Sequence, residues 1–315
     1  MSFQRYLSPL VVLAIAFAAS GTASAQELPP MEREVSPKVA KRLQLAAQAI
    51  RFVKRGIPNS GNQQEALLKT QGNSHYRMKL ARTTSVGSRT PENAGLAAKD
   101  SLAAKSAVIA CTSGGNCGEN ATLALHFLKG LGTGQTLTKA GVEGVDHAFV
   151  LIGDLKNDPL HEIVVVDTWV THSQPLLYTD FVFKKDRAQI RTFETATTKG
   201  KAEGNKTRQN RRKMTKALRV SMKKNPSPLM TQTTAKPNDL PGIWNQPHAA
   251  NYKFSYVTKD ASNKTSRVKF TQAFSKDIPK DVLKAHRTGR ATAATPRART
   301  PRVRATAPRT SRARR

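Results

Sequence analysis

The sequence predicts an α+β fold in which a helix that begins at a cysteine packs on an antiparallel sheet. A glycine-rich turn, residues 113–116, leads into apolar residues that recur at helical spacing up to Gly132. Two apolar runs, 148–152 and 163–166, then stand on either side of a turn signal, which is typical of a β-hairpin. The chain of 315 residues is long enough for one good core with appendages.

The N-terminus has the features of a secretory signal peptide. Arg5 precedes an apolar run at 7–19, and Ala23-Ser24-Ala25 forms a cleavage site of small residues. The apolar run is too short to span a membrane comfortably. We therefore expect residues 1–25 to be removed and the mature protein to be secreted or periplasmic, without a transmembrane helix. The alternative is an uncleaved N-terminal anchor.

The chain is strongly basic, with a formal net charge of +31. Only one of these charges, Arg5, lies in the predicted signal peptide, and much of the excess lies in two segments. The first is a predicted basic insertion at about 184–247. The second is an arginine-rich tail at 287–315, which has no acidic residue and is predicted to be disordered. This charge favours polyanionic partners such as nucleic acid, glycans or an anionic membrane surface.

The segment before the cysteine contains predicted helices. After a proline-rich lead-in at 26–37, predicted to be disordered, a single domain is expected over 38–286. An amphipathic helix is predicted over 39–53. Residues 59–89 are polar and weakly patterned, and we expect His75 to lie on the surface.

A second helix is predicted to start at Thr90-Pro91 and to run to about Ala110, because threonine is a good N-cap and proline fits the first turn. This helix delivers the chain to Cys111 and to the glycine-rich turn.

The next helix places Cys117 at its first position. Asn116 is a good N-cap residue, and Glu119 completes a capping-box pattern. Unpaired backbone N–H groups and the helix dipole favour a thiolate at such a position. Alternatively, Cys117 is a buried small residue, or it forms a disulfide with Cys111, as two cysteines in an exported protein often do.

The hairpin that follows brings a histidine and an aspartate together. If it is centred near Asn157, His147 lies opposite Asp167, and both side chains point to the same face of the sheet. Trp169 shares that face and would shield the pair from water.

Further elements follow the hairpin. The apolar run at 176–183 is predicted to add a strand, and Met214, Leu218 and Met222 are predicted to line one side of a short basic helix. Alternating residues at 252–256 and 268–270 predict a second hairpin that closes the same sheet.

Cys117, His147 and Asp167 form a nucleophile, base and orienter set. The thiolate attacks an acyl carbon, the imidazole holds and returns the proton, and the carboxylate fixes the tautomer of the ring. The backbone N–H of Cys117 is one oxyanion donor, and the side chain of Asn116 is a candidate for the second. The carboxylate of Glu119 disfavours a thiolate unless the capping box holds it on the backbone.

Three motifs carry a resemblance to a known family: Asn116-Cys-Gly-Glu-Asn-Ala121, Asp146-His-Ala-Phe-Val-Leu-Ile-Gly153 and Val165-Val-Asp-Thr-Trp169. They resemble the transglutaminase-like branch of the papain-like cysteine enzymes. Within it they are most similar to bacterial effector proteins of the AvrPphE/HopX type, whose core reads GNCxE…DHxFVxIG…VxDPW. The resemblance covers residues 105–183. It implies a papain/transglutaminase-like core with Cys117 as nucleophile, His147 as base and Asp167 as orienter. Arylamine N-acetyltransferases share the glycine turn and the Cys–His–Asp order.

The sequence thus predicts an exported thiol enzyme acting on amide or acyl bonds of proteins or peptides, as a protease, deamidase or transglutaminase. The alternative is a non-enzymatic polyanion-binding protein with a Cys111–Cys117 disulfide. We expect no cofactor and no metal site, because the chain has no HExxH motif and no paired Cys/His spacing. His126 is predicted to be structural, and His161 and His172 are weaker site candidates.

Overall fold

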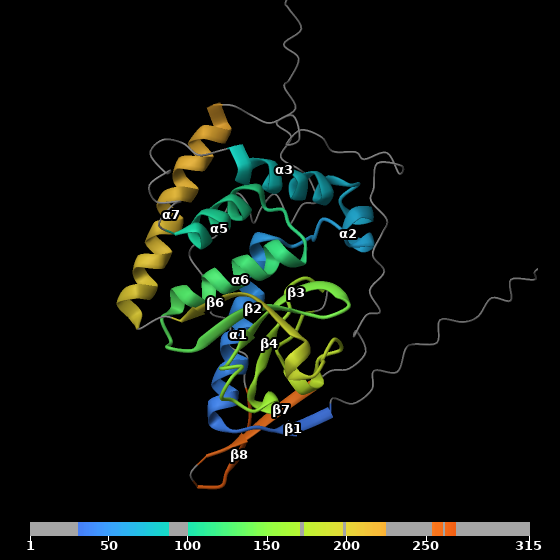
Figure 1. The fold of residues 1–315 in the computed structure, drawn as a ribbon, viewed down its shortest axis with the longest axis vertical. Coiled ribbons are helices and arrows are strands. Elements are labelled where there is room, and N and C mark those ends of the chain that lie inside the picture. Colours follow the sequence, from blue (N-terminus) through green and yellow to red (C-terminus); the bar gives the residue numbers. More distant parts are fainter. Residues whose placement is uncertain are drawn as a thin grey trace, which may run out of the picture.

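The structure, a computed structural model, describes residues 31–87, 100–170, 173–197, 200–224, 254–260 and 262–268. The fold is α+β, as the sequence predicts. Its main sheet has five antiparallel strands in the order β5-β4-β3-β2-β6 (Figure 1). These are β2 Thr136–Val142, β3 Val145–Ile152, β4 Val164–Val166, β5 Leu176–Leu177 and β6 Ile190–Thr197.

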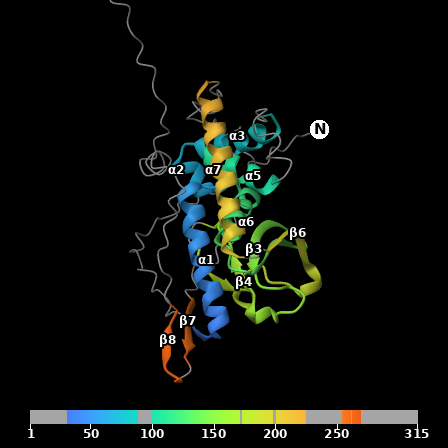
Figure 2. The same ribbon diagram turned by 90° about the vertical axis from the view of Figure 1, so that its left-hand side faces the viewer.

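Helices cover one face of this sheet. The helices α1, Pro37–Gly56, and α6, Cys117–Leu131, pack on the strands, and α5, Ser101–Thr112, and α7, Lys201–Lys224, pack against α6. Figure 2 shows α7 along the outside of this helical layer. Of the shorter helices α2, Gln64–Lys69, and α3, Asn73–Gly87, α3 packs against α5 and α2 packs against α3 (Figure 1).

The predicted helix over 39–53 is confirmed within α1. Ser36 caps it by accepting a hydrogen bond from the backbone N–H of Val39, at 3.3 Å, and Pro37 occupies the first turn. The predicted start of the next helix, at Thr90, lies outside the described residues. The expectation that this helix runs without a break to Ala110 is wrong, because Asp100 is the N-cap of α5 and its carboxylate accepts from the N–H of Ala103 at 3.0 Å.

Alternation along the strands builds a core on each face of the sheet. Even-numbered side chains of β3 and β4 contact the helices: Val150, Ile152, Val164 and Val166. Odd-numbered ones form the second cluster with Tyr178 and Phe181: Phe149, Leu151, Ile163 and Val165. All eight of these residues are fully buried, so this hairpin lies in the centre of the protein.

The β3–β4 hairpin is confirmed, but its register differs from the predicted one. Val150 pairs with Val166, whereas a hairpin centred near Asn157 places Val164 opposite it. A shift of two residues keeps every side chain on its face. The prediction also missed β2, which pairs with β3, and β6, which pairs with β2 and forms the edge of the sheet. The apolar run at 176–183 gives only the two-residue strand β5, followed by a 3-10 turn at Tyr178–Asp180.

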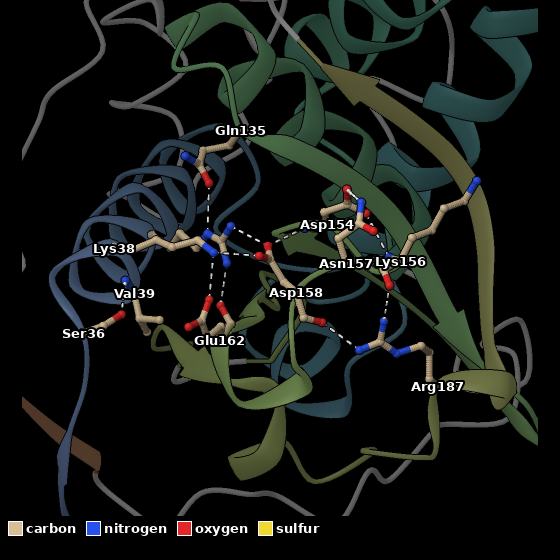
Figure 3. A network of polar contacts seen from close by, with 11 residues as sticks. Ser36, Lys38, Val39, Gln135, Asp154, Lys156, Asn157, Asp158, Glu162 and Arg187 are labelled. Atoms are coloured by element: carbon tan, nitrogen blue, oxygen red, sulfur yellow. Dashed lines mark hydrogen bonds and ion pairs between the residues drawn. The ribbon is translucent and has the colours of Figure 1, made fainter.

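The connection between β3 and β4 is fixed by ion pairs (Figure 3). Asp158 lies 2.6 Å from both Lys38 Nζ and Arg42 Nη2 of α1. Arg42 is buried, and it also donates to Gln135 and to the backbone carbonyl of Glu162 at 2.9 Å. Burial by itself raises the pKa of Asp158, but the hydrogen bonds from Lys38, from the backbone and from Arg42 outweigh it and lower that pKa to about 2.

The predicted basic insertion at 184–247 is part of the fold where the structure describes it. Its residues 190–197 form β6 on the edge of the main sheet, and 201–224 form α7. Met214 and Leu218 of α7 are buried against α5, as the predicted apolar stripe requires. Strand pairing and this apolar contact make residues 190–197 and 201–224 structural elements of the domain.

The second predicted hairpin is confirmed, but it does not close the main sheet. The strands β7, Phe254–Lys259, and β8, Thr265–Arg267, are antiparallel, and β7 pairs in parallel with β1, Met31–Glu34. The lead-in at 26–37, predicted to be disordered, therefore contributes a strand and a helix cap. The hydroxyl of Tyr256 accepts from the backbone N–H of Leu177 at 3.2 Å, which fixes the small sheet to β5.

Residues 59–87 are ordered in part as α2 and α3, which the weak sequence pattern did not predict. The surface position expected for His75 is wrong, because its residue is only 3% exposed. Burial lowers the pKa of His75. His126 is buried in α6, as a structural role requires.

The predicted signal peptide and the arginine-rich tail lie outside the described residues. Among the helices that the structure describes, none has the length and apolar character needed to cross a membrane.

Candidate active site

Cys117 begins α6, as predicted. The capping box is complete: the side chain of Asn116 accepts from the N–H of Gly118 at 3.3 Å, and Glu119 accepts from the N–H of Asn116 at 2.9 Å. Gly132 ends the helix in the left-handed conformation at φ +62°. At the first helical position the N–H of Cys117 has no carbonyl four residues earlier within the helix, so it remains the candidate oxyanion donor.

The turn before Cys117 is packed tightly on α3. The backbone N–H of Gly61 donates to the carbonyl of Gly115 at 2.8 Å. A Cβ on Gly114 would lie 2.2 Å from the carbonyl carbon of Arg77. Only glycine permits this approach, so the segment 59–87 holds the nucleophile's turn in place.

His147 and Asp167 are in direct contact. His147 Nε2 lies 2.8 Å from Asp167 Oδ2, and each residue is only 3% exposed. His147 lies near the start of β3, and Asp167 follows β4. Because the two strands are antiparallel, both residues come to the same end of the hairpin, where α6 also begins. The contact inferred from sequence parity is confirmed, but the expectation that the two residues lie directly opposite each other is wrong, because the register makes them diagonal neighbours.

Trp169 and its neighbours fix the aspartate. The N–H of Trp169 donates to Asp167 Oδ1 at 3.0 Å, which leaves Oδ2 for the histidine. The indole lies edge-on to the imidazole, with ring centroids 5.4 Å apart. Its Nε1 donates to Asn62 at 2.8 Å, and its carbonyl accepts from Gln63. Trp169 is 2% exposed, so it shields the pair from water as expected.

The histidine is held in its cationic form. Burial by itself lowers the pKa of His147, but the charge and hydrogen bond of Asp167, followed by those of Cys117, outweigh it and raise that pKa to about 10. Nε2 is occupied by Asp167, and Nδ1 is buried without a hydrogen-bond partner of ordinary geometry among the described residues. Nδ1 is therefore the ring nitrogen left to face Cys117.

The carboxylate of Glu119 is held by two partners. Besides its capping bond, its carboxylate pairs with Arg82 of α3, with Nε 3.0 Å from Oε1. Burial alone raises the pKa of Glu119, but the hydrogen bonds from Arg82 and from the backbone of Asn116 outweigh it and lower that pKa. Arg82 lies in the weakly patterned segment 59–89, where no local pattern indicates a contact with Glu119.

The two cysteines are not bridged. Both thiols are free, and Cys111 on α5 lies 3.4 Å from the backbone carbonyl of Thr215 on α7. Burial raises the pKa of the Cys111 thiol to about 11. The Cys111–Cys117 disulfide of the alternative interpretation is therefore wrong for this structure. The thiol of Cys111 contacts α7, whereas Cys117 lines the cavity described next.

A cavity of about 880 Å³ opens beside the cysteine. Asn116, Cys117, Glu119 and His147 line it, together with residues that sequence analysis did not select: Arg82, Lys139, Asp146, Arg191 and Phe193. Lys139 and Phe193 lie on the two strands that the sequence did not reveal, since β2 and β6 have no clear apolar alternation.

The other predicted candidates are not brought to this cavity. His161 lies in a 3-10 turn after β3, and His172 falls outside the described residues. Within the described ranges, no three His, Cys, Asp or Glu side chains are grouped so that they could hold a metal ion.

The geometry is that of a thiol beside an imidazole that is oriented by a carboxylate, at the wall of a cavity. Comparison of the chain with protein-family models, with curated proteins and with solved structures found no match, so its relationships and its reaction are inferred from the residues and their arrangement alone.

Proposed function

We propose that the protein is a cysteine-dependent enzyme that acts on amide or acyl bonds of proteins or peptides, with Cys117 as nucleophile, His147 as base and Asp167 as orienter. One observation carries the proposal. The buried His147–Asp167 pair, 2.8 Å between Nε2 and Oδ2, lies against Cys117 at the wall of an open cavity. The contact between base and orienter and the shared cavity wall of Cys117 and His147 support these three roles.

The proposed reaction has two steps. The thiolate of Cys117 attacks the acyl carbon and forms an Sγ–C bond, while the N–H of Cys117 donates to the oxyanion. The C–N bond then breaks, and the proton on His147 passes to the departing amine. In the second step His147 takes a proton from the acceptor, which attacks the thioester and releases Cys117.

The class of reaction depends on the molecule that accepts the acyl group from Cys117 and on the amine that leaves. Water as acceptor makes the enzyme a protease, when the leaving amine is a peptide N-terminus, or a deamidase, when it is ammonia. An amine as acceptor makes it a transglutaminase. The helix-borne cysteine and sheet-borne histidine and aspartate support the papain/transglutaminase-like core that the motifs of the sequence resemble. Export through the predicted signal peptide belongs to the same proposal.

The first test is the rate of iodoacetamide labelling of Cys117 against pH. It uses protein with Cys111→Ser, so that one thiol remains, and the same protein with His147→Ala. An imidazolium beside the sulfur stabilises the thiolate. We expect labelling to extend to lower pH with His147 present than without it.

A second variant tests whether the effect of His147→Ala on labelling comes from the lost charge or from changed packing around the ring. Phe183 touches the same imidazole, with ring centroids 5.2 Å apart, but carries no charge. Phe183→Leu therefore changes the packing of the histidine and leaves its ion pair. An unchanged pH profile in His147→Ala would contradict the enzyme proposal. A changed profile would justify assays for peptide cleavage, ammonia release and amine incorporation, with Cys117→Ser as the inactive reference.

A second function is favoured by α7. This helix of 24 residues buries one side, including Met214 and Leu218, against α5. Its opposite side is exposed and basic, with Lys206, Lys213, Lys216, Lys223 and Lys224. We propose that this surface, here called the α7 lysine face, binds polyanions by counterion release. The two functions are independent, since neither uses the residues of the other.

A further inference from the structure

Two cationic side chains line the cavity without a role in the proposed reaction. They are Lys139 on β2, which is half-buried, and Arg191 on β6, which is exposed. Within the described ranges no carboxylate forms an ion pair with either side chain, and the hydrogen bond of Lys139 goes to a neutral hydroxyl. Glu194 is the cross-strand neighbour of Lys139, and its charge favours the ammonium without a direct ion pair. A half-buried ammonium that lacks a direct ion pair is costly, so an anionic ligand beside it is stabilising.

Lys139 is positioned over the first turn of the cysteine helix. Its Nζ donates to the hydroxyl of Thr122 at 2.8 Å, and that hydroxyl donates to the carbonyl of Gly118 at 2.9 Å. Burial lowers the pKa of Lys139, and the positive charge of Lys105 lowers it further. The negative charges of Glu194, Glu119 and Cys117 raise that pKa but do not outweigh the burial. The ammonium is therefore within electrostatic reach of the sulfur.

The other charges of the cavity leave an excess of positive charge at this position. Arg82 is paired with Glu119. Asp146 is the remaining acidic residue of the cavity lining, and it is exposed at the rim. In the described lining Asp146 is thus the carboxylate left to offset Lys139 and Arg191, and Glu194 lies opposite Lys139 on β6 outside that lining.

The rim beside Arg191 is apolar and built by close packing. Phe193 is 57% exposed, although it is a large aromatic residue. Its ring lies directly over the backbone of Gly141, where an added Cβ would be 3.0 Å from Cζ. A Cβ on Gly118, beside the sulfur, would meet nothing within 4 Å. A substrate therefore meets open space at Gly118, next in sequence to Cys117, together with a cationic side and an aromatic edge.

We propose that Lys139 and Arg191 form an anion subsite beside Cys117, and that the acyl substrate carries a carboxylate close to the attacked carbonyl, as a peptide with an aspartate or glutamate next to that amide does. This inference rests on the proposed function and names its substrate class. Lys139 and Arg191 act as specificity residues and take no part in the proton transfers.

The test compares two alkylating reagents of the same size. N-iodoacetylglycine carries a carboxylate one residue from the reacting carbon, and N-iodoacetylglycinamide is neutral. With each reagent the Cys117 thiolate forms an Sγ–C bond and iodide leaves. The measured quantity is the ratio of the two second-order rate constants in the Cys111→Ser background. It reports the charge preference of the cavity and cancels changes in thiol reactivity that affect both reagents.

We expect Lys139→Met and Arg191→Gln each to lower the anionic-to-neutral ratio, by on the order of fivefold at low salt, because each removes one nearby positive charge. The ratio is expected to fall in the parent protein as salt screens the cavity. Lys41→Met is the matched control, since Lys41 is exposed on α1 and does not line the cavity; its ratio should stay that of the parent. Equal ratios in all four proteins would overturn the subsite and leave the enzyme proposal intact.

A second measurement covers the case in which neither reagent labels Cys117, which would contradict the proposed function. Calorimetric titration then compares N-acetylglutamate with N-acetylglutamine in Cys117→Ser protein and in the same protein with Lys139→Met. Tighter binding of the acid, abolished by Lys139→Met, supports the anion subsite on its own. Equal binding of the two ligands overturns it.

Discussion

His147 Nε2 lies 2.8 Å from Asp167 Oδ2, although the two residues are diagonal neighbours in the register that pairs Val150 with Val166. The contact forms because Asp167 lies beyond the end of β4, where the N–H of Trp169 turns its carboxylate toward the ring. A shift of two residues in the hairpin thus leaves the charge pair intact. The pair sets the protonation state of the histidine.

Asp167→Asn is expected to lower the pKa of His147 from about 10 toward the value of 6.5 for a free imidazole. The amide keeps a hydrogen-bonding group but removes the negative charge that favours the imidazolium. The measurement is NMR titration of the His147 ring between pH 4 and pH 11, with Asp146→Asn as control, because Asp146 is exposed at the rim. A His147 titration unchanged by Asp167→Asn would contradict the ion pair.

The same pair makes stability depend on pH. A pKa raised from 6.5 in the unfolded chain to about 10 in the folded protein means that the folded state holds its proton more tightly. The resulting stabilisation is complete below about pH 6.5 and is lost as pH rises through about 10. Urea unfolding of the parent and of His147→Gln at pH 6, 8 and 10 should show a difference in unfolding free energy that shrinks as pH rises. A difference that grows with pH would be the wrong sign.

Gly114→Ala is expected to destabilise the protein and to slow the alkylation of Cys117. The added Cβ would lie 2.2 Å from the carbonyl carbon of Arg77, so the glycine turn must move away from α3. We expect a loss of about 1–3 kcal/mol in unfolding free energy, measured by urea unfolding together with the iodoacetamide rate.

Gly118→Ala is the matched control for this prediction. Its Cβ meets nothing within 4 Å, and alanine is the better helix former. We expect the unfolding free energy to stay equal or to rise by up to about 1 kcal/mol. Equal losses for the two substitutions would show that the packing on α3 does not hold the turn.

The ion pairs of Asp158 are expected to differ in strength. Arg42→Met leaves a carboxylate without its buried partner, and we expect a cost of about 3 kcal/mol. Lys38→Met removes a partner that is half exposed, and we expect a cost of at most about 1 kcal/mol. Because the folded pKa of Asp158 is lowered to about 2 from 3.8, its contribution is present above about pH 4 and is lost as pH falls toward 2. Urea unfolding at pH 7 and pH 3 measures both effects, and equal costs for the two variants would contradict the burial argument.

The α7 lysine face is expected to govern the salt dependence of polyanion binding. Replacing Lys206, Lys213 and Lys216 by glutamine should reduce the slope of log K against log salt for duplex DNA by roughly 0.9 for each phosphate that the variant no longer neutralises. The control replaces Lys41, Lys156 and Lys184 by glutamine, which lowers the net charge equally on other elements. The same slope in both triple variants would place DNA binding elsewhere.

Local patterns in the sequence determined the elements that carry the chemistry. The N-cap and capping box at Asn116 and Glu119 predicted where α6 begins, because these bonds lie within one turn of chain. Alternation along β3 and β4 predicted that His147 and Asp167 share a face, because a side-chain period of two survives an error of two in the register.

Tertiary structure alone decided what surrounds these residues. The ion pair of Arg82 with Glu119 and the contact of Lys139 with Thr122 join segments that are distant in the chain. The strands β2 and β6 lack a strong pattern of their own. They are strands because β2 pairs with β3 and β6 pairs with β2. The free state of Cys111 depends on its packing against α7. Local propensities cannot predict such contacts, because the contacting residues are distant in the sequence and meet only in the folded chain.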